Sequence, residues 1–215
     1  MDKKFIKIDP FHIDTSLVKE VVHFLKNGGV IGYPTETFYG LGGDATNENV
    51  IQQIYRIKGR DPHKPLLILV SRVEEIYPLV LFVSPEAKIM MEHFWPGPLT
   101  LVFRSSQILP KSLTGENNKV GIRISPDPVC QALLRHFEKP LISTSANPAG
   151  KRPAESALQV LKYFGERLGM IVDGGERKSI LPSTVVDVSE NFPKVIRKGL
   201  VDIKKIQNLI GKIDG

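Results

Sequence analysis

The chain has 215 residues, a formal net charge of +6 and a single cysteine, Cys130. This length suits one domain, or two small ones. It has no run of about 18 apolar residues and no signal-peptide pattern, so the sequence predicts a protein without membrane association. One cysteine excludes an internal disulfide framework and fits a reducing compartment, and we therefore expect a cytoplasmic protein. The positive charge favours anionic partners such as nucleotides or RNA.

Local signals for helix ends divide the chain into alternating helices and strands. Asp14 or Thr15 can cap a helix that runs to Lys26, because a side-chain oxygen can accept from the backbone N–H groups of the first turn. Asn47 can cap a second helix that ends near Lys58. Further helices are predicted to open at Ser84-Pro85, at Ser125-Pro126 and near Asp202.

Short apolar runs between these helices predict strands. The run Leu66–Val70 is continuous, as expected for a strand that is buried on both faces. The predicted strands are 30–33, 66–70, 99–103, 120–124, 141–144, 169–172, 184–188 and 195–197. This alternation indicates an α/β domain in which helices pack on a twisted sheet. We expect a single domain over residues 1–215, with its core at about 14–200 and its last helix at 202–212.

Several common catalytic patterns are missing. There is no Gly-x-x-x-x-Gly-Lys-Ser/Thr phosphate loop and no Gly-x-Ser-x-Gly nucleophile elbow. Residues 40–45 match the spacing of a dinucleotide-binding fingerprint, but the preceding strand ends several residues too early. The five histidines share no metal-ligand spacing, so we assign no metal site to protein side chains. Cys130 lies on the apolar face of a helical pattern, which predicts a buried structural thiol.

Residues 34–43, Pro-Thr-Glu-Thr-Phe-Tyr-Gly-Leu-Gly-Gly, form a polar, glycine-rich loop directly after a predicted strand. Loops at strand ends are where open α/β sheets bind ligands. The hydroxyls of Thr35 and Thr37 can orient a small polar substrate, and the glycines let the backbone approach it closely. A plain turn with hydroxyl-to-backbone hydrogen bonds explains the same residues, and the sequence leaves both interpretations open.

A cationic segment lies between the second helix and the strand 66–70. Lys58, Arg60 and Lys64 fall within seven residues. Part of this charge can complement the C-terminal end of the helix. Alternatively, these cations face a triphosphate, which arginine grips through two hydrogen bonds and lysine binds as a point charge.

Small polar side chains follow another predicted strand. Four of the five residues 143–147 can form side-chain hydrogen bonds: Ser143, Thr144, Ser145 and Asn147. This capacity exceeds the need of a turn, although capping of a helix would also use it. Polar groups stand at the ends of two later strands as well, within 182–187 and 195–199.

These segments, taken together and in this order, resemble the YrdC-type threonylcarbamoyl-AMP synthase family. The matching blocks are 34–42, 58–60, 94–100, 120–123, 143–147 and 182–185. The resemblance runs from about Gly28 to Gly199, and the chain looks like the short form of the family, without the additional C-terminal domain of longer relatives. It implies an open α/β fold with a large twisted mixed sheet, packed helices and a concave basic cleft.

The resemblance also implies roles for individual residues. The implied catalytic core, which is also the core of the ATP site, is Lys58, Arg60, Ser145 and Asn147. The further ATP contacts that it implies are Lys64, Lys119 and Arg197. The residues implied around the threonine and carbamoyl groups are Thr35, Thr37, Arg123, Ser143 and Ser183. Arg123 is the implied partner of the threonine carboxylate, whereas Arg152 receives no role because the alignment around it is open.

The implied reaction is the ATP-dependent activation of L-threonine with bicarbonate, which gives threonylcarbamoyl-AMP and pyrophosphate. Such a reaction joins anionic groups, so it needs positioning and electrostatic stabilisation more than a covalent nucleophile. Magnesium is the implied counterion on the ATP phosphates. The product is expected to pass to a separate transferase that modifies tRNA adenosine.

Two other functions stay open. An RNA-binding module without catalysis would use the basic charge, but sequence-tolerant binding of single strands needs exposed aromatic residues, and aromatic residues make up only 7% of the chain. A paralogue of the same fold would use the same ATP residues to activate a different amine or carbamoyl group. If the chain is the adenylate-forming enzyme, we expect any tRNA binding by it alone to be weak and sensitive to salt.

Overall fold

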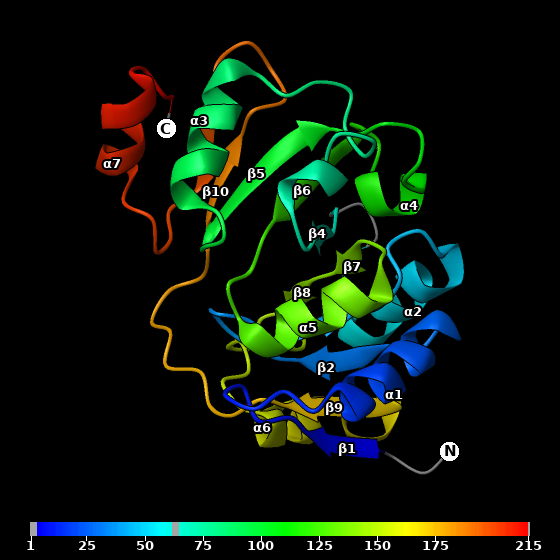
Figure 1. Cartoon of the computed structure of the whole chain (residues 1–215). Coiled ribbons are helices and arrows are strands. Elements are labelled where there is room, and N and C mark those ends of the chain that lie inside the picture. Colours follow the sequence, from blue (N-terminus) through cyan, green and yellow to red (C-terminus); the bar gives the residue numbers. More distant parts are fainter. Residues whose placement is uncertain (1–3, 62–64, 215) are drawn as a thin grey trace.

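The computed structural model describes residues 4–61 and 65–214, in which two mixed β-sheets lie side by side with helices packed around them (Figure 1). The first sheet runs in the order β1 (Lys4–Lys7), β9 (Met170–Asp173), β2 (Ile31–Tyr33), β3 (Gly40–Gly42) and β8 (Thr144–Ser145). Strands β1, β9 and β2 are parallel to one another, whereas β3 and β8 each run antiparallel to the strand before them in this order. We call it the N-terminal sheet, because it contains the first three strands of the chain.

The second sheet, which we call the C-terminal sheet, has β10 and β11 at one edge. Its order is β11 (Lys194–Arg197), β10 (Thr184–Asp187), β5 (Leu99–Arg104), β6 (Lys119–Arg123), β4 (Leu67–Leu69) and β7 (Leu141–Ile142). Parallel pairs join β10 to β5 and β4 to β6, and the remaining pairs are antiparallel. The expected α/β fold with a mixed sheet and packed helices is confirmed, and its strands are divided between two sheets.

The two sheets meet at Ser143, which separates β7 from β8. The sequence predicted one strand over 141–144, but the backbone changes sheet inside that run. The Ile142 amide donates to Gly43 O at 2.9 Å, beside the N-terminal sheet, and the next amide, of Ser143, donates to Leu67 O at 2.8 Å, beside the C-terminal sheet. The break therefore joins the two sheets through consecutive residues.

Helices α1 (Thr15–Lys26) and α5 (Pro128–Phe137) pack against each other and cover one face of the N-terminal sheet (Figure 1). Their apolar residues form one cluster with Ile31 of β2 and Val172 of β9. Because side chains alternate along a strand, Ile171 points to the opposite face and packs in the cluster that contains Val160. That residue lies on α6 (Ala157–Phe164).

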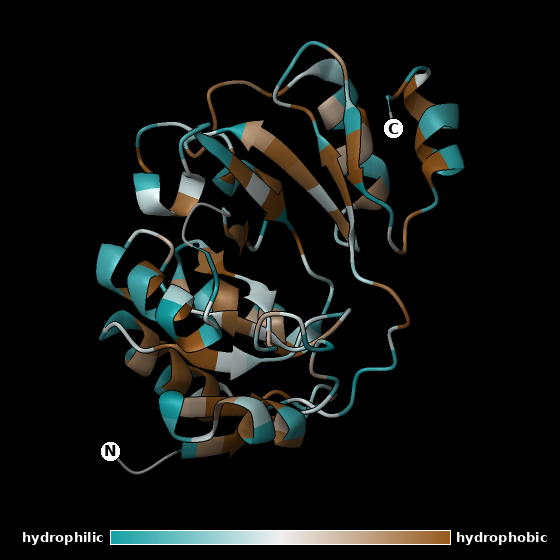
Figure 2. Ribbon diagram, turned by 180° about the vertical axis from the view of Figure 1, so that it is seen from behind, coloured by the Kyte–Doolittle hydropathy of each residue, from teal (hydrophilic) through white to brown (hydrophobic). Residues whose placement is uncertain are grey.

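The remaining helices contribute apolar residues to the cluster that contains Val160 and Ile171. They are α2 (Glu48–Lys58), α3 (Pro85–Phe94), α4 (Lys111–Thr114) and α7 (Ile203–Ile210), with short 3₁₀ turns at Val73–Glu75 and Gly165–Arg167. Helices α3 and α7 pack together beside the C-terminal sheet. Figure 2 shows the apolar residues concentrated on the strands, with polar residues on the outer sides of the helices. No described helix is long and apolar enough to cross a membrane.

Four predicted helix starts are confirmed by their caps. The side chains of Asp14, Asn47, Ser84 and Asp202 accept backbone N–H groups at 2.8, 3.0, 3.1 and 3.0 Å, respectively. The start predicted at Ser125-Pro126 is wrong by two residues, because α5 begins at Pro128. There the Asp127 carboxylate, not the Ser125 hydroxyl, accepts the N–H of Cys130 at 2.8 Å.

Cys130 is fully buried in the cluster under α5, and burial raises the pKa of its thiol. The prediction of a buried structural thiol is therefore confirmed. The sequence reading missed four elements, namely β1, β3, α4 and α6. One of them corrects the expected loop, because β3 turns the end of the glycine-rich segment 34–43 into the second strand of a hairpin with β2.

Candidate active site

A cleft of about 480 Å³ opens between the two sheets. Its N-terminal wall comes from the loop between β2 and β3 and from the junction at 143–145. Its opposite wall is the face of the C-terminal sheet formed by β5, β6 and β10. The cleft therefore lies where loops at strand ends meet a second sheet, which is a common place for a ligand site.

The alternation of side chains along β6 explains which of its residues face the cleft. Lys119, Gly121 and Arg123 line the cleft, while Val120 and Ile122 point the other way into the apolar core, where both are fully buried. Gly121 keeps the floor open, because a Cβ at this position would lie 3.3 Å from Thr100 Cγ2 and 3.3 Å from Leu67 Cβ. Lys119 and Arg123 thus flank a position of β6 that has no side chain.

The cleft brings together residues that the sequence analysis placed in one site. Nine of the twelve proposed site residues line it: Thr35, Thr37, Arg60, Lys119, Arg123, Ser143, Ser145, Ser183 and Arg197. Lys58 and Asn147 lie behind its wall, and Lys64 falls outside the described residues. None of the described residues that line the cleft is acidic. The roles proposed for these residues stay predictions.

Lys58 is held beneath the loop that carries Ser145 and Asn147. Its ammonium donates to Ser145 O at 2.5 Å and to Asn147 O at 2.9 Å, and its residue is only 5% exposed. Burial, and then the nearby charge of Arg60, lowers the pKa of Lys58 to about 8. The ammonium therefore supports the wall of the cleft from behind and brings positive charge close to it.

The Asn147 side chain closes the same loop. Its amide nitrogen donates to Lys151 O at 2.6 Å and to Pro148 O at 3.1 Å. Arg60 instead reaches the cleft, where its Nη2 donates to Pro65 O at 3.1 Å and where burial lowers the pKa of the guanidinium. The four residues proposed as a catalytic core thus fall into two pairs: Lys58 and Asn147 organise the loop, while Arg60 and Ser145 face the cleft.

Two other cleft cations have polar partners at the edge of the C-terminal sheet. Lys119 Nζ lies 3.0 Å from Asp187 Oδ2 and 3.3 Å from Glu190 Oε1. Burial opposes the charge of Lys119, but these two hydrogen-bonded carboxylates outweigh it and raise the pKa of the lysine. Arg197 Nη2 donates to Ser183 O at 2.9 Å and to Ser183 Oγ at 3.0 Å. Both cations are thereby held in place at the cleft.

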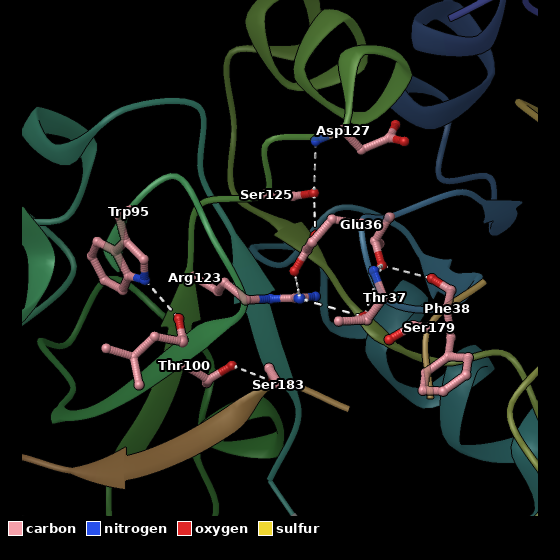
Figure 3. Close-up of polar contacts among 12 residues, drawn as sticks. Glu36, Thr37, Phe38, Trp95, Thr100, Arg123, Ser125, Asp127, Ser179 and Ser183 are labelled. Carbon is pink, nitrogen blue, oxygen red and sulfur yellow. Dashed lines mark hydrogen bonds and ion pairs between the residues drawn. The ribbon is translucent and has the colours of Figure 1, made fainter. Parts of the chain in front are cut away.

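Arg123 reaches from β6 to the loop between β2 and β3, on the opposite wall, which carries Thr35 and Thr37 and is called the threonine loop below (Figure 3). Its Nη1 forms an ion pair with Glu36 and lies 3.5 Å from Thr37 Oγ1. Ser125 Oγ donates to the other oxygen of the Glu36 carboxylate at 2.5 Å. The Arg123 side chain is 5% exposed and the Glu36 side chain 13% exposed, so this ion pair is largely removed from water.

Hydroxyl groups complete the lining. Thr35 Oγ1 donates to Phe38 O at 2.6 Å and lies 3.1 Å from Thr37 Oγ1, which fixes the loop in a tight turn. On the opposite wall, Thr100 Oγ1 and Ser183 Oγ are 2.9 Å apart (Figure 3). These hydroxyls can donate or accept, and so they suit a ligand that carries both kinds of polar group.

Sequence reasoning missed two polar residues of this site, Glu36 and Thr100. Glu36 stood inside the quoted Pro-Thr-Glu-Thr block, but nothing local pairs it with Arg123. Thr100 could have been found from alternation, since it lies two residues before Val102 on β5 and both line the cleft. Among residues 4–61 and 65–214, no group of three or more His, Cys, Asp or Glu side chains could hold a metal ion.

The sequence of this chain matches a known protein-family model. The Sua5/YciO/YrdC model, described as "Telomere recombination", matches residues 23–199. The chain belongs to the Sua5/YciO/YrdC family. The family resemblance drawn from the ordered sequence blocks is confirmed, because this match covers every one of them from 34–42 to 182–185.

Relatives in this family share much of the sequence. The chain is 36% identical over 190 residues to the threonylcarbamoyl-AMP synthase of Pyrococcus abyssi, which covers 88% of this chain and 56% of that relative. It is 38% identical over 174 residues to the enzyme of the same name from Thiobacillus denitrificans, which covers 81% of this chain and 91% of the relative. The chain thus spans about half of the first relative and most of the second.

A solved structure of the Sua5/YciO/YrdC family has the same fold. The crystal structure of Pyrococcus abyssi Sua5 complexed with L-threonine matches the whole chain with a TM-score of 0.93 and 32% sequence identity. This chain covers 62% of that protein. The likeness confirms the expected α/β fold of mixed strands and packed helices, whose strands lie in two sheets rather than one.

Proposed function

We propose that this chain is a threonylcarbamoyl-AMP synthase, which activates L-threonine with bicarbonate and ATP and releases pyrophosphate. The observation that carries this proposal is the cleft between the two sheets, which gathers Arg60, Lys119, Arg123 and Arg197 with a set of hydroxyl groups. The names of the relatives and the threonine complex of the Pyrococcus protein support the same substrate class.

The proposed reaction has two bond-forming steps. The ammonium of threonine first loses one proton to water, and the neutral amine then attacks the carbon of bicarbonate. A carbon–nitrogen bond forms, and the leaving hydroxide takes one of the two amine protons and departs as water. The new carboxylate oxygen then attacks the α-phosphorus of ATP, and the bond to the leaving pyrophosphate breaks. Negative charge builds on that pyrophosphate, and preorganised cations lower the barrier most effectively where such charge develops.

The cations of the cleft suit a polyanionic substrate. We assign the triphosphate to the side of Arg60, Lys119 and Arg197, with Ser145 as a hydrogen-bonding partner. Burial lowers the pKa of Lys58 and that of Arg60, so each carries its charge at a cost that a bound anion would offset. Lys58 and Asn147 contribute by holding the loop that presents Ser145.

Magnesium fits this scheme as a companion of the substrate. No carboxylate lines the described part of the cleft, so this lining offers a magnesium ion no anionic protein ligand. We therefore propose that magnesium enters on the ATP phosphates, where it would neutralise charge on the leaving group. Threonine is assigned to the side of Arg123, with Thr35, Thr37, Ser143 and Ser183 around it.

The proposed product serves tRNA modification through a separate transferase. None of the residues assigned above is needed to read a base, so we propose that synthesis of the adenylate is independent of RNA. Binding of tRNA by this chain alone is expected to be electrostatic and to weaken steeply as salt rises. This separates the proposal from an RNA-binding module, for which tight binding at moderate salt and no turnover of ATP are expected.

A substrate panel tests the proposal. Pyrophosphate release from ATP is measured with bicarbonate and, in turn, threonine, serine, glycine and other amino acids. Release should require both bicarbonate and an amino acid, and serine should be roughly 10- to 200-fold poorer than threonine, because one methyl group in an apolar pocket supplies that much discrimination. Equal rates with all the amino acids would favour a paralogue that activates another amine.

A further inference from the structure

Glu36 is an acidic residue beside the proposed threonine site, and it does not fit a site built only for anions. Its carboxylate lies in the threonine loop and pairs with Arg123, the residue assigned to the threonine carboxylate. A carboxylate in that place neutralises the guanidinium and competes with the substrate group that the guanidinium is expected to bind. Burying such a pair is not by itself stabilising, because the desolvation of two charges can exceed their attraction.

The chemistry of an α-amino acid removes this conflict. Its carboxylate and its ammonium are carried on the same carbon atom, so a protein that binds both needs a cation and an anion side by side. Arg123 and Glu36 are such a pair, and they lie in direct contact. Without ligand, each satisfies the charge of the other, which keeps both side chains oriented in a largely dehydrated site.

Arg123 also has hydrogen-bonding capacity to spare. Among the described residues, its Nε–H is buried and has no acceptor. A buried donor without an acceptor is costly, and a carboxylate oxygen of a ligand would satisfy it. Glu36 is tethered independently, since Ser125 Oγ donates to its second oxygen and the Ser125 hydroxyl in turn accepts the Asp127 amide at 3.2 Å. The Glu36 carboxylate is therefore held in place by more than Arg123.

We propose that Glu36 binds the ammonium group of the amino-acid substrate while Arg123 binds its carboxylate, so that this pair selects zwitterionic α-amino acids. The inference rests on the proposed function and extends it, because it assigns the amine of threonine to a residue. On substrate binding, Glu36 would give up its contact with the Arg123 guanidinium, wholly or in part, and pair with the substrate ammonium instead. Selection against ligands without an amine would follow from leaving the Glu36 carboxylate short of a partner.

The alternative is that Glu36 only orients Arg123. Both ideas predict weaker binding of threonine when Glu36 is changed, so affinity alone does not separate them. They differ for β-hydroxybutyrate, which is threonine without its amine. A residue that only orients Arg123 affects both ligands equally, whereas a residue that binds the ammonium affects threonine alone.

The experiment measures binding of L-threonine and of β-hydroxybutyrate by calorimetry, without ATP, to the wild-type chain and to Glu36→Gln. The glutamine keeps the shape, its oxygen can still accept from Arg123 and its NH2 can donate to Ser125 Oγ, but it lacks the charge. We expect threonine affinity to fall roughly 30- to 300-fold, while β-hydroxybutyrate affinity changes by less than about 3-fold. The preference for threonine should thus largely disappear.

Two further variants complete the test. Asp187→Asn removes a carboxylate from another cleft cation, Lys119, and should leave the ratio of the two affinities unchanged. Glu36→Asp retains the charge on a shorter side chain and should keep part of the preference, which also covers the case that Glu36→Gln does not fold. Thermal unfolding and ATP affinity report on the fold of every variant.

Three results would overturn the inference. The first is an equal loss of affinity for both ligands in Glu36→Gln, and the second is a loss of the preference in Asp187→Asn as large as that in Glu36→Gln. The third is a wild-type chain that binds both ligands equally well. If the wild-type chain binds no amino acid of the panel, the proposed function itself fails and this inference falls with it. If the wild-type chain binds threonine and one of the three results above is found, only the inference fails.

Discussion

The ammonium of Lys58 lies 2.9 Å from the backbone oxygen of Asn147, which ties the end of α2 to the loop after β8. The same ammonium donates to the Ser145 oxygen at 2.5 Å. Two segments that are far apart in the sequence are thus joined by one charged group, and the cleft residues Arg60 and Ser145 stand on either side of this junction. The charge state of Lys58 should therefore govern the shape of the ATP side.

The first prediction is a loss of activity at alkaline pH. The pKa of Lys58 is about 8, so the ammonium is present below that pH and is lost as the pH rises through it. We expect kcat/KM for ATP to be roughly tenfold lower at about pH 9 than at about pH 7. Lys58→Arg retains a charge throughout this range, so its pH profile should be flat between these values, whatever its absolute rate.

The stability of the fold should rise over the pH range in which Lys58 loses its proton, whereas the activity should fall. The pKa of Lys58 is lower in the folded chain than its ordinary value of 10.5, so the unfolded chain binds more protons between about pH 8 and 10.5. The free energy of unfolding of the wild-type chain should therefore rise relative to Lys58→Arg as the pH increases through this window. Denaturant titrations at several pH values measure this difference, and a difference that does not change would contradict the assigned pKa.

The second prediction concerns Arg60. Its guanidinium lines the cleft, and removal of one preorganised charge usually costs two to three orders of magnitude in rate. Arg60→Ala should lower kcat/KM by about 100- to 1,000-fold with little change in unfolding temperature. Arg56→Ala, at an exposed position of α2 four residues earlier, is the matched control and should keep its activity. Near-normal turnover by Arg60→Ala would remove this residue from the site.

Sequence features that act within a few residues predicted the fold well. The caps at Asp14, Asn47 and Ser84 were readable because each bonds to an amide two or three residues away. Strand β3 was not readable, because Gly40 and Gly42 disfavour a strand in isolation and the hairpin forms only by pairing with β2 and β8. At 125–128, two residues that could each cap a helix stood close together, and only tertiary contacts decide between them.

The contacts of Ser125 show what made that decision. Its hydroxyl donates to Glu36, a residue of the opposite wall, and so it is engaged there while Asp127 caps the helix. The prediction of the candidate site was limited in the same way, by contacts that form only in the folded chain. Ordered motif blocks placed Arg123 in the cleft, but its pairing with Glu36 joins β6 to the loop between β2 and β3, which only the folded chain brings together. The residue types of the site were therefore predictable, whereas their ionic partners were not.

The third prediction concerns the connection between β9 and β10. Arg177 Nη1 lies 2.5 Å from Asp127 Oδ2, and the Asp127 side chain is 1% exposed. Arg177→Ala would leave a buried carboxylate without its cation, so we expect a loss of about 3–5 kcal/mol in the free energy of unfolding. The double variant with Asp127→Asn should recover part of it, because asparagine is neutral and still caps a helix.

The exposed pair of Arg104 and Glu190 is the control for this measurement. Their side chains are 51% and 56% exposed, and so Glu190→Gln should change stability by no more than about 1 kcal/mol. If Arg177→Ala proved as mild as Glu190→Gln, the buried ion pair would not hold the connection in place.

The fourth prediction concerns Gly199, which packs against the backbone of Ser183 and Thr184 at the start of β10. A Cβ at this position would lie 2.5 Å from the Thr184 nitrogen and 2.5 Å from the Ser183 carbonyl carbon, and a backbone cannot move aside as a flexible side chain can. Gly199→Ala should cost about 1–3 kcal/mol of stability. It should also lower kcat/KM, because Ser183 lines the cleft. Lys198→Ala, at the exposed neighbouring residue, should change neither quantity appreciably.

The central claim is that this cleft makes threonylcarbamoyl-AMP from small substrates alone. Its most direct test incubates the purified chain with ATP, magnesium, L-threonine and isotope-labelled bicarbonate, without tRNA, and identifies the nucleotide products by mass spectrometry. The account predicts a labelled threonylcarbamoyl-AMP together with pyrophosphate. Formation of ADP and phosphate, or of no adenylate unless tRNA is added, would contradict it.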